Sequence, residues 1–156
     1  MPSGAAVVKK LKKIIDTRGL VEGEEFLHSG VWNFSDPSFI LPFMLMRDYR
    51  AGTEHLDEMW LVIHAVESYP KEVYIRELVA NIEVLSEKSP YLVNHLIHRI
   101  KNTEADLECF LGELRRNRPA RTDCIMAVLE KVKQQSDENV PEKVADVERI
   151  MAVLRE

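Results

Sequence analysis

Apolar residues recur at helical spacing along this chain, and the glycines and prolines fall almost entirely between the periodic segments. Apolar side chains placed three and four positions apart form one buried face of an α-helix. The signals of strands, such as alternating β-branched runs on either side of Asn-Gly or Asp-Gly, are missing from the sequence. The pattern therefore predicts an all-α fold.

Capping residues and helix breakers set the expected helix boundaries. In the first third of the chain we expect helices over residues 5–18, over residues 22–28, and from Ser35 to Arg50 with a kink or break at Pro42. From Thr53 onward six amphipathic helices are predicted, beginning near Thr53, Pro70, Ser89, Thr103, the residues after Pro119, and Asn139 or Val140. Among their apolar positions we place Trp60 in the core.

The six helices are joined by connections of only about two to five residues, which forces neighbours to pack roughly antiparallel. Hairpins of this size stack into a short α-solenoid of the HEAT or armadillo kind, or close into an irregular helical bundle. The repeat has no recurring signature, so both architectures stay open, with the solenoid favoured. No linker or low-complexity segment divides the chain, and we expect one domain over residues 1–156.

The composition excludes a membrane protein. Of the 156 residues 46% are hydrophobic and 30% are charged, and no apolar run approaches the roughly 20 residues that cross a bilayer. The lysine-rich start has the pattern of an amphipathic helix and not of a signal peptide. The two cysteines, Cys109 and Cys124, suit a reducing compartment. A cytoplasmic protein is expected.

The acidic residues are segregated in the middle of the sequence. Between Thr53 and Leu114 there are twelve Asp and Glu against five Lys and Arg, a net charge of −7, whereas the whole chain carries −5. A concentrated negative field favours a basic macromolecule as the partner, and it disfavours nucleic acid and anionic membranes.

Three like-charge pairs at i, i+4 spacing stand out among these acids, and each costs about 0.2 to 0.5 kcal/mol in an isolated helix. Two explanations are open: the dipole at a helix N-terminus offsets the repulsion, or a basic partner satisfies the carboxylates on binding. We take as candidate partner-binding residues the three pairs and one neighbouring acid: Glu54, Asp57, Glu58, Glu83, Glu87, Glu104 and Glu108.

Neither a metal site nor a catalytic constellation is expected. His95 and His98 are three residues apart, but no further ligand motif accompanies them, and we interpret both as boundary residues. No phosphate-binding glycine loop, nucleophile elbow or paired thiol is present. A basic cluster, Arg115, Arg116, Arg118 and Arg121, could bind phosphates or an acidic partner. We therefore predict a protein without cofactor or enzymatic activity, although catalytic groups that converge only in the fold remain an alternative.

Three segments of the sequence form one pattern: Met59–Glu67, Tyr74–Leu78 and His95–Asn102. Together they resemble the immunity protein 30 family of bacterial polymorphic-toxin systems, and the resemblance spans roughly residues 36–135. Their shared features are a Trp followed by His and Glu one and two turns later, and a helix that ends in Arg-Ile-x-Asn. Lys101 occupies a position before the Asn where an apolar residue is expected.

The resemblance implies a small cytoplasmic protein that binds and blocks a toxin domain delivered by a neighbouring bacterium, as in contact-dependent growth inhibition. Such toxins are often nucleases with basic active sites, which an acidic inhibitor would cover. The expected partner is thus the C-terminal domain of a cognate toxin. The family supplies no shared binding residues. A helical-repeat adaptor for protein–protein interaction is the alternative.

Overall fold

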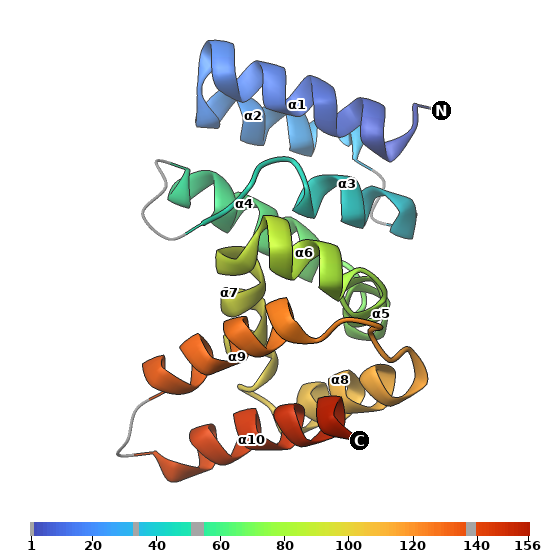
Figure 1. The fold of residues 1–156 in the computed structure, drawn as a ribbon. Helices are drawn as coiled ribbons and strands as arrows, with labels where there is room; N and C mark the ends of the chain where they lie inside the picture. Colours follow the sequence, from blue (N-terminus) through green and yellow to red (C-terminus); the bar gives the residue numbers. More distant parts are fainter. Residues whose placement is uncertain (1, 33–34, 51–54, 137–139) are drawn as a thin grey trace.

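The computed structural model describes residues 2–32, 35–50, 55–136 and 140–156, and it confirms the all-α prediction (Figure 1). Every regular element in these ranges is helical: α1 (Gly4–Arg18), α2 (Leu20–Phe26), a π-helical turn (Leu27–Val31), a 3-10 turn (Pro37–Phe39), α3 (Ile40–Met44), α4 (Leu56–Glu67), α5 (Lys71–Ala80), α6 (Ile82–Lys88), α7 (Pro90–Ile100), α8 (Glu104–Arg116), α9 (Asp123–Gln135) and α10 (Pro141–Arg155). Within those ranges no helix combines the length and the apolar character needed to cross a bilayer.

Several predicted boundaries are confirmed, and each has a local cause. The Thr103 hydroxyl accepts a hydrogen bond from the Asp106 backbone N–H at 3.2 Å and so caps α8. Pro90 and Pro141 lie in the first turns of α7 and α10, where a backbone N–H has no helical partner to lose. Gly19 separates α1 from α2 with a φ of 106°, a left-handed conformation that favours glycine.

The helix expected to begin at Pro70 is interrupted, because Asn81 leaves the helical conformation at φ −121° and ψ 14°. Its side-chain amide donates to the Glu77 carbonyl at 2.9 Å, a local bond that competes with the helix backbone. The chain resumes as α6, and Ile82 and Leu85 remain buried as the apolar pattern predicts. One expected helix is therefore two.

The helix expected to reach Arg50 ends at Met44, and residues 45–50 run instead toward α7. There the Ser89 hydroxyl donates to the Arg47 carbonyl at 2.9 Å and accepts from the Tyr49 N–H at 3.3 Å. The Tyr91 N–H also donates to the Tyr49 carbonyl at 3.1 Å. These bonds satisfy backbone groups of a non-helical segment that would otherwise lack partners. Pro42 does not break the helix, since it lies in the first turn of α3.

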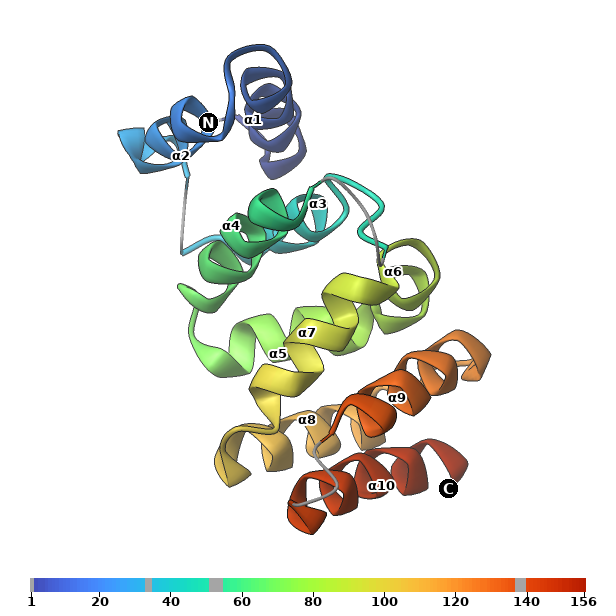
Figure 2. The ribbon, with the colours of Figure 1, turned by 90° about the vertical axis from the view of Figure 1, so that its left-hand side faces the viewer.

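The helices are arranged in successive layers between the two ends of the chain (Figures 1 and 2). The α1–α2 hairpin forms one end, α3 and α4 follow, α5 to α7 form the middle, and α8 to α10 form the other end. A buried apolar cluster runs through the layers from Val7 to Leu154. The layered order positions α4 next to both the terminal hairpin and α7.

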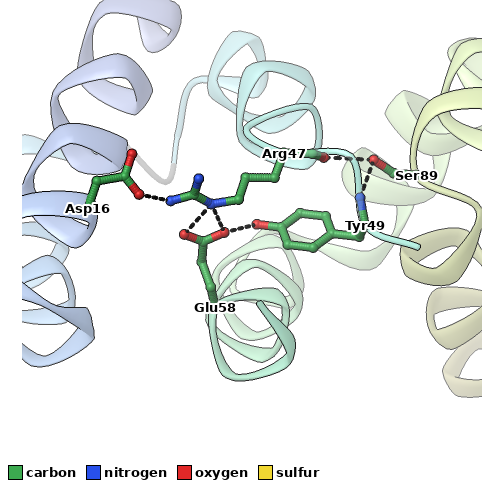
Figure 3. Close-up of polar contacts among 5 residues, drawn as sticks. All are labelled: Asp16, Arg47, Tyr49, Glu58 and Ser89. Carbon is green, nitrogen blue, oxygen red and sulfur yellow. Dashed lines mark hydrogen bonds and ion pairs between the residues drawn. The ribbon is translucent and has the colours of Figure 1, made fainter. Parts of the chain in front are cut away.

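A polar network around a buried carboxylate connects α1, α4 and Ser89 at the start of α7 (Figure 3). Glu58 of α4 is only 3% exposed and accepts two hydrogen bonds from Arg47 Nε, at 2.7 and 2.6 Å. The Tyr49 hydroxyl donates to the same carboxylate at 2.8 Å, and Arg47 also pairs with Asp16 of α1. Burial raises the pKa of Tyr49, which keeps this hydroxyl a donor. The prediction of Glu58 as an exposed residue is thus wrong, because Arg47 and Tyr49 draw its carboxylate inside.

Lys101, which departs from the expected apolar pattern, is also buried. Its ammonium donates to the Ser136 hydroxyl at 3.1 Å, and it lies on the carboxyl side of α7 with 3% exposure. Burial lowers the pKa of the Lys101 ammonium, because the charged form loses its hydration. The position is therefore buried, as the apolar pattern indicates, although the side chain is not apolar.

We expect Glu58→Gln to lower the free energy of unfolding by about 2 to 4 kcal/mol, because it leaves the Arg47 guanidinium partly buried without its carboxylate. Tyr49→Phe should cost about 1.5 kcal/mol or more, since it removes one bond to a charged acceptor. The control is Asp16→Asn, whose exposed ion pair should contribute less than about 1 kcal/mol. Urea unfolding followed by circular dichroism measures all three. Equal losses for Glu58→Gln and Asp16→Asn would contradict this account.

Candidate partner-binding surface

The predicted acids on α6 are partly neutralised by an arginine of the loop between α8 and α9. The Arg121 guanidinium lies 3.8 Å from the Glu83 carboxylate and 3.5 Å from that of Glu87. The Arg121 backbone N–H also donates to Glu83 at 3.1 Å. A cation of the same chain thus offsets the repulsion within this i, i+4 pair.

The predicted acids on α8 are partly neutralised in the same way by an arginine of α10. Arg149 contacts the carboxylate of Glu104 at 3.0 Å, pairs with Glu108, and lies 3.6 Å from Asp146. The repulsion between Glu104 and Glu108 therefore has a third explanation besides the helix dipole and a basic partner, namely an internal arginine bridge. The exposure of these groups keeps the bridge weak, at about 0 to 1 kcal/mol per pair.

The structure does not gather the seven predicted acids into one patch. Glu104 and Glu108 lie in the first turns of α8, whereas Glu83 and Glu87 lie beside the loop that follows its last turn, about 20 Å away along the helix. Glu58 is buried, and Glu54 lies outside the described residues. Asp57 is exposed, and it has no ion pair with any residue that the structure describes.

An exposed aromatic surface lies over α4 and α7, and sequence reasoning missed it. We define it by four side chains: Trp60, His64, Tyr91 and His95. The Trp60 ring is 5.2 Å from the His95 ring and 6.2 Å from the His64 ring, and Tyr91 meets His95 edge-on at 4.6 Å. Trp60 is 37% exposed, so its placement in the core is wrong. Burial lowers the pKa of His95, which favours its neutral ring.

A signal for this surface is present in the sequence. Leu56, Trp60 and His64 are spaced by four residues and share one side of α4, and all three are exposed. The buried side of α4 is completed without them by Met59, Val62, Ile63 and Val66. When a tryptophan lies four residues from a histidine and other residues already form the apolar stripe of the helix, the pattern indicates that the tryptophan is exposed.

A groove of about 350 Å³ adjoins the aromatic surface between α2 and α4. Its apolar walls include Leu27 and Leu61, and Trp60 belongs to both the groove and the aromatic surface. Two carboxylates, Glu24 of α2 and Asp57 of α4, also line it. The arrangement offers apolar contact area with negative charge beside it, which suits a protein partner.

The segments that carry the family resemblance meet in the structure. Glu67 near the end of α4 forms a bidentate ion pair with Arg99 of α7, with one of its two bonds at 2.7 Å. Trp60 precedes Glu67 on α4 and His95 precedes Arg99 on α7, and the rings of Trp60 and His95 are in contact. These two contacts fix α7 against α4 beneath the aromatic surface.

Two further arginines of the predicted basic cluster have local partners. Arg116 lies 3.3 Å from the buried Glu113, and Arg115 lies 3.8 Å from Glu156. In the part of the chain that the structure describes, no three His, Cys, Asp or Glu side chains come together as they would around a metal ion. His98 is within 3.4 Å of the Gln135 side-chain oxygen.

Replacement of Arg149 should test the internal neutralisation of the α8 acids. We expect Arg149→Gln to lower the free energy of unfolding by up to about 1 kcal/mol in dilute buffer and by less in about 1 M NaCl. In a Glu104→Gln, Glu108→Gln background the same change should cost almost nothing. Urea unfolding gives these values, and an equal loss in both backgrounds would mean that Arg149 acts by packing and not by charge.

The comparison with protein families gives one match. The family model described as Immunity protein 30 matches residues 20–110, more than half of the chain. The matched stretch begins earlier than the resemblance seen in the sequence and ends before α9. It contains both walls of the groove and all of the aromatic surface. No curated protein and no solved structure matches the chain. This chain belongs to the immunity protein 30 family.

Proposed function

We propose that this protein binds a cognate bacterial toxin domain and neutralises it without catalysis of its own. The match to an immunity protein family carries the proposal. In the specific form that we favour, the toxin is a nuclease delivered by contact-dependent growth inhibition, and the complex forms in the cytoplasm. The net charge of −5 supports a basic partner, since it favours encounter with a cationic surface.

The binding face that we propose is the aromatic surface together with Asp57 and the groove. Partly exposed Trp and Tyr side chains supply large contact areas at low entropic cost, and such residues dominate binding energy in many interfaces. Trp60 and Tyr91 are held in place by His95 between them. The face is thus already ordered before the partner arrives, which lowers the cost of association.

The acids have two separate roles in this proposal. Asp57 contacts the toxin. Glu54 is also assigned a toxin contact, and only its position in the sequence supports this assignment. Glu83, Glu87, Glu104 and Glu108 contribute to the long-range field, because their arginine partners leave each pair with an excess of negative charge. Glu58 has no contact role, since it is buried in the fold.

We also propose that the layers follow the order of a short HEAT- or armadillo-like solenoid within one domain. The succession of helical pairs between the two chain ends supports it (Figure 2). An arrangement of this kind exposes extended side surfaces for partner binding.

Co-expression tests the function. The gene directly upstream should encode a large toxin, and its C-terminal domain should arrest growth when expressed alone. We expect this protein to restore growth and to co-purify with that domain as a stable complex. Growth arrest that persists in the presence of the folded protein would contradict the proposal.

Trp60→Ala tests the binding face. We expect it to weaken toxin binding by at least about thirtyfold, equivalent to about 2 kcal/mol, because it removes the central aromatic contact. The thermal midpoint should change little, since the ring is partly exposed. The matched control is Val140→Ala, at a position of nearly equal exposure, 36% against 37%, at the start of α10. Calorimetric titration with the toxin domain measures both, and equal affinities for the two variants would place the interface elsewhere.

A further inference from the structure

Two carboxylates in the groove differ from the predicted acids on α6 and α8, because no cation among the described residues pairs with them. Glu24 and Asp57 are exposed, and among the described residues neither takes part in an ion pair. No lysine or arginine lines the groove. The internal arginine bridges of α6 and α8 thus have no counterpart here, and two negative charges remain available at this site.

Most of the remaining lining is apolar, and His28, His64 and Ser68 complete it. Leu20 and Leu27 come from the hairpin side, Leu61 and Ala65 come from α4, and Trp60 forms part of the wall. Leu27 is 4% exposed and Trp60 is 37% exposed, so the wall runs from the core to the surface. A side chain that enters the groove therefore meets hydrocarbon and an indole ring, with carboxylates beside them.

This combination selects one kind of side chain. Lysine and arginine have long apolar stems that cover hydrocarbon surface, and their cationic heads bind carboxylates. A guanidinium or ammonium is also attracted to the face of a tryptophan ring. A purely apolar side chain would leave Glu24 and Asp57 desolvated without a partner, and an acidic one would be repelled.

Building on the proposed function, we infer that the groove between α2 and α4 receives an arginine or lysine side chain of the toxin domain. The stem lies along Leu27, Leu61 and Trp60, and the cationic head lies between Glu24 and Asp57. The groove thereby adds a specific contact to the face that the aromatic surface provides.

The test measures association and dissociation rates of the complex with the toxin domain encoded upstream. Contact and long-range steering predict different results, since truncated contacts raise the dissociation rate whereas steering changes the association rate. We expect Glu24→Gln and Asp57→Asn each to raise the dissociation rate about tenfold. In the double variant the dissociation rate should rise by less than the product of the two single increases, because both carboxylates bind one cation.

The control is Glu72→Gln on α5, an exposed acid that is likewise outside any ion pair among the described residues. It should change the dissociation rate less than about twofold, because it removes the same charge away from the groove. Substitution of the toxin's surface arginines and lysines one at a time should find one whose loss makes Asp57→Asn harmless.

Two results would overturn the inference while the proposed function stands. The first is that the wild-type protein binds the toxin domain, but Glu24→Gln and Asp57→Asn leave the dissociation rate of the complex unchanged. The second is an equal effect of Glu72→Gln, which would mean that the groove acids act only through the overall field. Failure of the wild-type protein to bind the toxin domain would instead overturn the proposed function itself.

Discussion

The buried carboxylate of Glu58 is the interaction on which the arrangement of the binding face depends. It holds α4 to the segment containing Arg47 and Tyr49, and through Arg47 to α1 (Figure 3). A charge with 3% exposure is tolerable only with such partners, so these layers cannot shift without leaving it unpaired. The α1–α2 hairpin and α4 form the two sides of the groove, and their relative position follows from this network.

The central negative charge of the sequence has a different meaning in the folded protein. Arg121 pairs with Glu83 and Glu87 across 38 and 34 positions in sequence, and Arg149 reaches Glu104 across 45. Net charge over a sequence window cannot show such pairings, because the cations belong to a loop and to the last helix. The negative charge left for a partner is therefore smaller than the window indicates. At the groove, the carboxylates of Glu24 and Asp57 have no counterion among the residues that the structure describes.

Local chemistry made most of the helices predictable, and longer-range contacts explain the exceptions. Thr103, Pro90 and Pro141 begin helices through bonds or conformations within one turn, which a sequence displays directly. The non-helical chain after Met44 is bonded to Ser89, some 40 residues away, and no local pattern could indicate that. Trp60 fits an apolar stripe at helical spacing, which predicts a core position, although its alignment with His64 marks the exposed side of α4. The groove needs the packing of α2 on α4 and could not be read from either helix alone.

The account makes one central claim: the protein neutralises its toxin through the face formed by α2, α4 and α7. Hydrogen–deuterium exchange of the complex with the toxin domain tests this most directly, since bound backbone is protected where the partner covers it. The claim predicts slower exchange on binding in residues 20–28, 56–65 and 91–95. Protection confined to α8, α9 and α10, with exchange in α2 and α4 unchanged, would contradict it.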